Sequence, residues 1–242
     1  MWSVWSETVH LYLGQGMSLL QIGHGQEVVT PHAATMPVAQ VLAKLTETMG
    51  QHNFLKKPRR SKLRVTLSGA LCPAMTYAAP PDVTRWDELH RIAQASAAMT
   101  LGILVDQVLS EMDINQPQLA SAIAAPLMQA LQGWAGQHRF RLTSVQPLWA
   151  TASQSAETGK AAIRGLVVQE PDSVTVMAKV QNGKYVAATL TGPEDQLPTL
   201  TRRWLVSQGL SDENLLKLRF TAATHTVMQQ GPRLWEKHWD QA

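Results

Sequence analysis

The sequence predicts an α/β fold composed of two related halves. Segments in which apolar and polar residues alternate are typical of half-buried strands, and they occur in two groups of three along the chain. Each group is followed by a segment with apolar residues at helical spacing and then by a further strand-like segment. The same order of elements therefore occurs twice, with the two copies roughly 160 residues apart.

The first group of strands lies at the beginning of the chain. Residues 2–13 predict a strand with a bulge near its middle, and the Gly-Gln-Gly turn at 14–16 leads to a second strand at 17–22. A Gly-His-Gly turn at 23–25 leads to a third strand at 27–30. These three strands form a meander.

A helix and a fourth strand complete the first copy. Pro37 suits the first turn of a helix, where the missing N–H of proline is not needed. Leu63, Val65 and Leu67 alternate in the strand, which follows a loop rich in lysine and arginine. The apolar face of the helix consists of Val38, Val41, Leu42, Leu45 and Met49.

The middle of the chain predicts additional α/β units. A helix is expected at 82–98, with Thr84 and Asp87 as a loose N-terminal capping box. Its inward residues are expected to be Trp86, Leu89, Ala93 and Ala97. Further strands are expected at 105–112, 119–124 and 140–145, and further helices at 127–134 and 147–152.

The second copy begins with strands at 163–169 and 174–180. Asn182 and Gly183 are a strong hairpin signal, because a type I′ turn needs positive φ at both central positions. The return strand at 185–189, a helix at 195–208 closed by Gly209, and a strand at 215–220 follow.

Two meanders with crossover helices predict a duplicated ribonuclease-H-like architecture. We expect residues 1–145 to form the first half, with inserted α/β units, and residues 146–242 to form a truncated second half. An amphipathic helix is predicted at the C-terminus from Leu234, Trp235, His238 and Trp239.

Three parts of the chain match a known pattern: RVTLSG at 64–69 with Ala-Pro-Pro at 79–81, QLASAIAAPLMQAL at 118–131, and LTSVQPLW at 142–149. In pattern and order these segments resemble the actin-like assembly-platform proteins of type IV pili and type II secretion, the PilM and GspL cytoplasmic-domain group. The resemblance implies an actin-like fold. It also implies docking to the cytoplasmic tail of an inner-membrane protein and to a hexameric assembly ATPase.

The resemblance also implies where a nucleotide would bind. In active members, the first turn of each meander holds phosphate through an acid at the strand end and through glycine amides. In the first turn of this chain, Gly14 and Gly16 are present, but the nearest upstream acid is Glu7, half a strand away. Gln15 is no substitute for a carboxylate as a metal ligand.

The second turn departs further from that pattern. Gln169 stands at the acid position, no glycine follows it, and Pro171 lacks a backbone N–H. Glu170 and Asp172 are interpreted as surface turn acids that add negative charge beside a nucleotide. We therefore expect a protein that is not an enzyme and that uses no cofactor and no metal.

Other catalytic patterns are absent from the sequence, which has no phosphate-binding loop, nucleophile elbow or zinc-protease helix motif. His10, His24 and His32 could share a metal, but surface histidines at strand ends are the expected interpretation. The single cysteine, Cys72, excludes an intramolecular disulfide. It could pair with His90 as a nucleophile, although a buried thiol is the default.

The sequence has no recognisable signal peptide and no membrane-spanning stretch, so we expect a cytoplasmic protein that reaches the inner face of the membrane through its partner. A formal net charge of +3 is mild, but cations concentrate in one run. That run contains Lys56, Lys57, Arg59, Arg60, Lys62 and Arg64. It could contact an acidic partner or anionic lipid.

The leading hypothesis is a non-catalytic protein-binding scaffold of a pilus or secretion machine. Its candidate partner-binding residues are Lys56, Lys57, Arg59 and Arg60 together with Trp235 and Trp239. One alternative is an actin-like ATPase or switch. The other is a nucleic-acid-binding module that uses the basic run, although no aromatic residue is interleaved there to stack on bases. A homodimer is left open.

Overall fold

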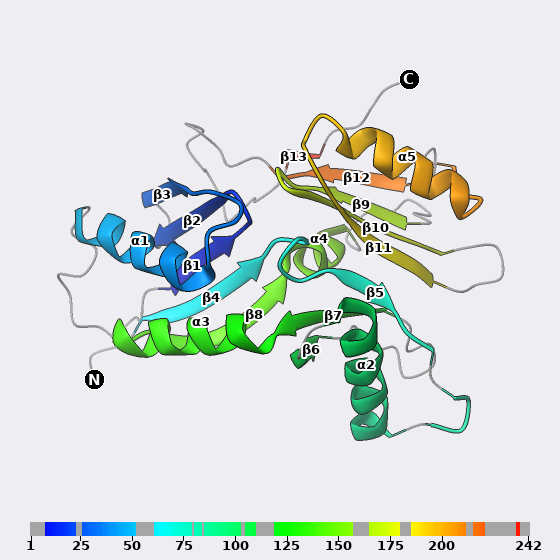
Figure 1. Cartoon of the computed structure of the whole chain (residues 1–242), viewed down its shortest axis with the longest axis horizontal. Helices are drawn as coiled ribbons and strands as arrows, with labels where there is room; N and C mark the ends of the chain where they lie inside the picture. The colour runs from blue at the N-terminus through cyan, green and yellow to red at the C-terminus, as the bar shows by residue number, and fades with distance from the viewer. Residues whose placement is uncertain are drawn as a thin grey trace, which may run out of the picture.

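The protein is an α/β molecule with three sheets (Figure 1). The computed structural model describes residues 8–22, 26–51, 61–78, 80–83, 85–102, 105–109, 119–156, 165–179, 185–211, 215–220 and 236–237. Among the described helices, none combines the length and the apolar composition that a membrane crossing requires.

The first sheet has five strands in the order β3-β2-β1-β4-β8. The strands β1 (Thr8–Leu13), β2 (Met17–Ile22) and β3 (Gln26–Pro31) form the predicted antiparallel meander. The strand β4 (Lys62–Leu67) pairs parallel to β1. The strand β8 (Arg141–Pro147) pairs parallel to β4, with a bulge near the start of the pair.

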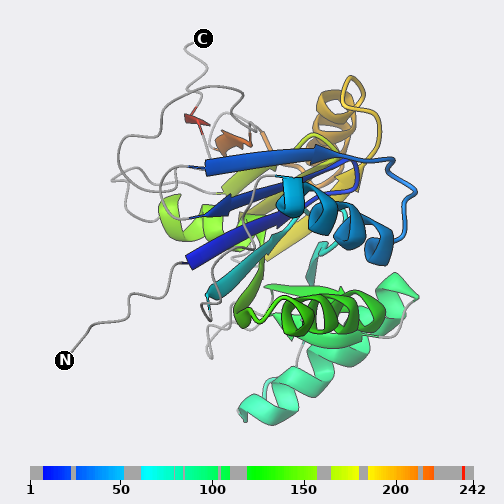
Figure 2. The same ribbon diagram turned by 90° about the vertical axis from the view of Figure 1, so that its left-hand side faces the viewer.

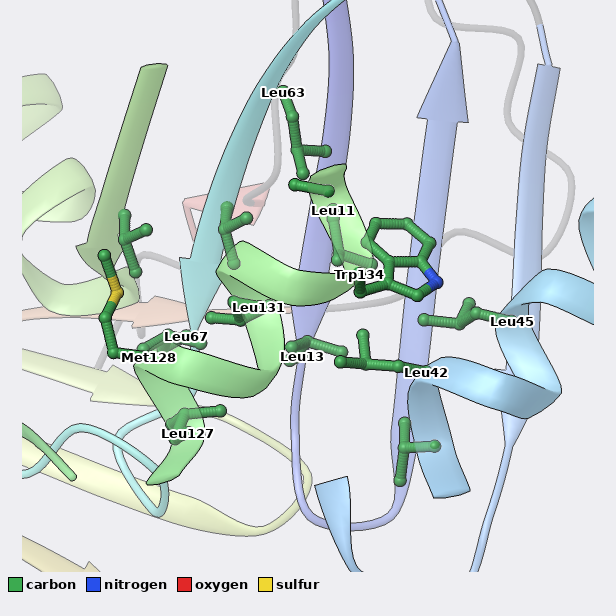
Figure 3. Close-up of a cluster of buried hydrophobic side chains, with 14 of the residues drawn as sticks. Leu11, Leu13, Leu42, Leu45, Leu63, Leu67, Leu127, Met128, Leu131 and Trp134 are labelled. Atoms are coloured by element: carbon green, nitrogen blue, oxygen red, sulfur yellow. The ribbon is translucent and has the colours of Figure 1, made fainter. Parts of the chain in front are cut away.

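Two helices cover one face of this sheet. They are α1 (Val38–Gln51) and α3 (Ala125–Gln137), and the indole N–H of Trp134 on α3 donates a 3.0 Å hydrogen bond to Thr46 Oγ1 on α1. Leucine side chains from both helices point at the strands β1 and β4 (Figure 3). The predicted apolar face of α1 is confirmed, because Val41, Leu42, Leu45 and Met49 are all buried.

The second sheet has the order β11-β10-β9-β12-β13. The strands β9 (Gly165–Gln169), β10 (Ser173–Lys179) and β11 (Tyr185–Thr191) form the second meander, and β12 (Leu215–Arg219) pairs parallel to β9. The helix α5 (Leu197–Ser207) covers one face of this sheet. As predicted, a glycine in the left-handed conformation, Gly209 with φ of 66°, follows this helix.

The two halves repeat one another down to single backbone hydrogen bonds. In the first turn the amide of Gly14 donates to the carbonyl of Met17, and in the second the amide of Glu170 donates to the carbonyl of Ser173. The carbonyl of Leu13 accepts from Ser68, as that of Gln169 accepts from Phe220. The predicted duplicated architecture of two meander-plus-helix halves is therefore confirmed, and Gly14-Gln15-Gly16 corresponds to Glu170-Pro171-Asp172.

A smaller unit is inserted in the first half. Its sheet has the order β5-β7-β6, formed by β5 (Ala74–Thr76), β7 (Leu119–Ala124) and β6 (Val105–Leu109). The helix α2 (Trp86–Leu101) packs against it through Leu89, Ala93 and Ala97, none of which is exposed. Figure 1 shows this unit below the second sheet.

Two details predicted for α2 are wrong. Trp86 is 49% exposed instead of inward, because it is the first residue of the helix and lies at the end of the packed face. The helix begins four residues later than predicted, and its N-cap residue is Arg85, which makes no side-chain capping bond. Thr84, the predicted cap, lies outside the described residues.

The helix α4 (Leu148–Ala156) lies between the two large sheets (Figures 1 and 2). Its Leu148, Trp149 and Ala152 are fully buried against strands of both halves. The cluster around them includes Tyr12, Leu19, Leu166, Val168, Met177, Leu216, Leu218 and Phe220. Residues of both halves therefore share one hydrophobic cluster around α4.

The predicted amphipathic helix at the C-terminus is wrong at the two residues of that segment that the structure describes. Glu236 and Lys237 form the short strand β13, antiparallel to β12, instead of part of an amphipathic helix, because the open edge of β12 offers unpaired backbone groups. Trp235 and Trp239 lie outside the described residues, as do Asn182-Gly183 of the predicted hairpin.

Candidate functional site between the two halves

The two first turns of the meanders, for which the sequence predicted no phosphate binding, lie directly against each other. The backbone N–H of Gln15 donates a 2.6 Å hydrogen bond to Asp172 Oδ2. This bond joins the first half of the chain to the second across 157 positions. We call the residues at this junction, Tyr12 to Gly16, Ser68 to Gly69 and Gln169 to Ser173, the turn contact.

Glu170 is the centre of the turn contact. Its Oε1 accepts a 3.0 Å bond from the Tyr12 hydroxyl, and its Oε2 accepts a 2.8 Å bond from the backbone N–H of Gly69. The hydroxyl of Ser173 lies 3.2 Å from Oε2 and 3.0 Å from Asp172 Oδ1. Three chain segments that are distant in sequence therefore converge on one carboxyl group.

The interpretation of Glu170 as a surface turn acid is wrong, since the residue is only 1% exposed. The reason is the packing of the two halves, which brings Tyr12 and Gly69 of the first half over the second turn. Asp172, in contrast, is only partly buried.

Burial changes the acid–base behaviour of this site. Desolvation, and secondly the negative charge of Asp172, raise the pKa of Glu170 from 4.5 to about 8, although its hydrogen bonds to Gly69, Tyr12 and Ser173 act in the opposite direction. Burial and the same two acids raise the pKa of Tyr12 well above 10. A neutral Glu170 can donate its own proton to Ser173 Oγ, which can in turn donate to Asp172 Oδ1.

Gly69 allows the close approach that this arrangement needs. A Cβ atom at this position would lie 2.5 Å from Thr175 Oγ1 and 2.9 Å from Thr189 Cγ2. These threonines belong to β10 and β11 of the second half and bond to each other at 3.0 Å. The N–H of Gly69 reaches Glu170 only because no side chain intervenes.

Chemically, the turn contact is an anion-binding arrangement whose backbone donors are occupied by the chain's own acidic side chains. Backbone N–H groups of a glycine-containing turn are the groups that bind phosphate oxygens in many proteins. Here the amides of Gln15 and Gly69 already donate to Asp172 and Glu170. Pro171, at the position equivalent to Gln15, has no N–H to offer.

The candidate partner-binding residues fall outside the part of the chain that the structure describes. Lys56, Lys57, Arg59, Arg60, Trp235 and Trp239 lie outside the described residues, and so does His24. Lys62 and Arg64 are exposed on β4. Among the described residues, no group of three or more His, Cys, Asp and Glu side chains is placed to hold a metal ion.

Cys72 is a buried thiol, as the default interpretation expected. Its Sγ lies 3.0 Å from Ser121 Oγ, with which it makes its hydrogen bond. Burial raises the pKa of the Cys72 thiol to about 12. A thiol held neutral in this way does not act as a nucleophile near pH 7.

Sequence reasoning did not find the role of Tyr12, Ser173 and Gly69. Tyr12 appeared only as a strand residue, and Gly69 only as a strand end. The sequence did contain a partial signal. Glu170 and Asp172, with Pro171 between them, occupy the positions that correspond to Gly14 and Gly16 in the first half. The pattern does not reveal that these acids meet the other turn, since that depends on how the halves pack.

Comparisons with known proteins agree with the fold. No family model matches the sequence, and no curated protein sequence matches it. A Bacteroides thetaiotaomicron protein described as having an actin-like ATPase fold and unknown function superimposes with a TM-score of 0.55 at 9% identity, covering 90% of this chain and 83% of that one.

Two further structures come from assembly systems. The cytoplasmic domain of EpsL, an inner-membrane component of the type II secretion system of Vibrio cholerae, has a TM-score of 0.53 at 12% identity, covering 88% of this chain and 82% of that one. A chain of the PilM–PilN type IV pilus biogenesis complex has a TM-score of 0.49 at 11% identity, covering 84% of this chain and 66% of that one. The chain therefore has the actin-like, ribonuclease-H-like fold, and its structural relatives include the group that its sequence resembles.

Proposed function

We propose that this protein is a non-catalytic scaffold that binds another protein in a type II secretion or type IV pilus assembly platform. The observation that carries the proposal is the turn contact, in which Asp172 and Glu170 accept hydrogen bonds from the amides of Gln15 and Gly69. A nucleotide at this junction would have to displace both carboxyl groups and then lie beside them.

Electrostatics supports the same conclusion. The negative charge of Asp172 repels a polyphosphate, and Glu170, which is buried and neutral near pH 7, has no exposed oxygen with which to bind a magnesium ion. The shared core around Trp149 also joins the halves. The halves are thus held together by packing and by hydrogen bonds between the chain's own groups.

The proposed partner is an inner-membrane component of such a machine, as the resemblance of the sequence implies. A structural relative, the EpsL cytoplasmic domain, itself belongs to an inner-membrane component, which supports a place at that membrane. In this proposal the chain is held at the cytoplasmic face of the membrane through that partner. A scaffold of this kind uses its surface and not the junction between its halves.

Nucleotide binding can be tested by the melting temperature of the full chain with and without ATP and magnesium. A ligand present at about 1,000 times its Kd adds about 4 kcal/mol of stability and raises the melting temperature by several degrees. We expect no shift at millimolar ATP, with an ATP-binding actin-like protein as the positive control. A shift of several degrees would instead support the ATPase or switch alternative.

Partner binding can be tested by purifying the tagged chain from its native cells. We expect an inner-membrane protein of a pilus or secretion system to be retained, and to be retained equally with and without ATP. Purification that recovers the chain without any such component would contradict the scaffold function.

A further inference from the structure

Three positive side chains lie together on the first sheet. Lys62 and Arg64 are alternate residues of β4, so they point to the same face. Lys62 is the direct neighbour of Arg141 on β8. All three side chains are exposed, and the intervening Leu63 is buried in the opposite face.

These cations are unpaired within the described part of the chain. The ion pairs there join Arg85, Arg91 and Arg219 to acids, and none includes Lys62, Arg64 or Arg141. Like charges on directly neighbouring strand positions repel and destabilise a sheet. Lys62 and Arg141 are such a pair, and an anion that bridges them would convert the repulsion into attraction.

The spacing of the cations is set by the sheet. Residues two positions apart on a strand are separated by about 7 Å, and neighbouring strands by about 4.8 Å. An extended peptide presents its alternate side chains at the same separation of about 7 Å. Acidic residues at alternate positions of such a peptide can therefore meet Lys62 and Arg64 together, while Arg141 reaches one of them from the adjacent strand.

From this geometry we infer that the face formed by Lys62, Arg64 and Arg141 is the docking surface for an extended acidic segment of a protein partner. The inference rests on the proposed scaffold function and names its surface. Guanidinium groups on rigid strands suit carboxylates, with which they form paired hydrogen bonds in a fixed plane. Binding to anionic lipid needs no fixed spacing and is typical of flexible basic clusters.

The edge of the sheet contributes to this surface. The bulge between β4 and β8 lies between the Leu63–Leu142 and Arg64–Ser144 neighbours, and there Thr143 Oγ1 donates a 2.9 Å bond to the carbonyl of Leu63. Bulges at sheet edges redirect side chains. In the sequence the basic run from Lys56 to Arg60 shortly precedes β4.

The test compares two double variants of the full chain. Arg64→Gln with Arg141→Gln removes two charges from the proposed surface, and Arg202→Gln with Arg203→Gln removes two exposed charges from α5 as the matched control. The probe is a fluorescent peptide of alternating glutamate and threonine, with a glutamine–threonine peptide as its neutral counterpart.

We expect the wild-type chain and the α5 variant to bind the glutamate peptide, the β4/β8 variant to bind it about tenfold more weakly, and added salt to weaken binding in all cases. Equal binding by the two variants would overturn the inference. So would binding of phosphatidylserine vesicles that depends on Arg64 and Arg141 without any binding of the peptide, which would assign the face to a membrane.

The two proposals fail in different ways. If a pilus or secretion component co-purifies equally with the wild type and with the β4/β8 variant, the scaffold function stands and this surface is wrong. If no such component is retained by the wild type, the scaffold function fails whatever the peptide result.

Discussion

The hydroxyl of Tyr12 and the carboxyl group of Glu170 are joined by a 3.0 Å hydrogen bond, although the two residues are 158 positions apart. The ring of Tyr12 also stacks on Phe220, with the ring centres 4.4 Å apart. One side chain of the first half thus makes both a polar and an apolar contact with the second half, and both contacts are buried. The predictions below test how far the stability of the protein depends on this junction.

The first prediction concerns pH. The folded protein holds the Glu170 proton up to about pH 8, whereas the unfolded chain releases it near the ordinary pKa of 4.5. Unfolding at a pH between these two pKa values therefore releases a proton. The stabilising contribution of Glu170 to the free energy of unfolding is complete below pH 4.5 and is lost as the pH rises to about 8. The loss is on the order of 5 kcal/mol.

The variant Glu170→Gln should remove this dependence. The amide is uncharged at every pH, its oxygen can accept from Tyr12 at the Oε1 position, and its NH₂ can donate to Ser173 at the Oε2 position. The N–H of Gly69 then loses its acceptor, which lowers the free energy of unfolding at all pH values without adding a dependence on pH. Urea unfolding at a series of pH values should show a flatter profile for Glu170→Gln than for the wild type. Glu47→Gln, on the exposed side of α1, is the control and should keep the wild-type slope.

The second prediction concerns the close approach of Gly69. Gly69→Ala would place a methyl group within 2.5 Å of Thr175 Oγ1, so we expect it to destabilise the protein by about 1–3 kcal/mol. Gly133→Ala, in the exposed middle of α3 with nothing within 4 Å of the new methyl group, should instead stabilise it by about 0.5–1 kcal/mol. Denaturant unfolding measures both; equal effects would mean that the halves do not approach as described.

The third prediction concerns the core between the sheets. Trp149 is 1% exposed on α4, and Trp149→Ala should cost about 3–5 kcal/mol because the cavity opens between the two halves. Trp86 is 49% exposed, and Trp86→Ala should cost less than about 1 kcal/mol. Thermal unfolding of the two variants makes the comparison. A small loss for Trp149→Ala would show that α4 is not a shared element of the core.

The fourth prediction concerns Cys72, the single cysteine of the chain. Because the thiol is fully buried and its pKa is raised to about 12, it should react with Ellman's reagent only when the protein opens. The reaction should be slow for the native protein and rapid in denaturant. Rapid labelling of the native protein at pH 8 would contradict the burial of β5 and its preceding turn.

Local sequence patterns predicted the helices and strands well where the ends and the buried face of an element follow from the spacing of its apolar residues. The strand at Met17–Ile22 has the predicted ends, and the α1 stripe from Val41 to Met49 is buried as its spacing indicated. Predictions were wrong at positions whose conformation or burial is set by contacts with residues distant in sequence. Glu236 and Lys237 pair with the edge of β12, and Trp86 lies beyond the packed face of α2. Neither outcome depends on the residues next to them.

By itself the sequence determined the order of the elements, the duplication and the composition of the two turns, because apolar periodicity and residues such as Pro171 act through local backbone geometry. Only the tertiary structure decided that these turns meet, that Glu170 is buried and neutral near pH 7, and that Arg141 stands beside Lys62. The physical reason is that hydrogen bonding, desolvation and charge proximity depend on distances in space. Packing of the two halves, and not the spacing along the chain, sets those distances.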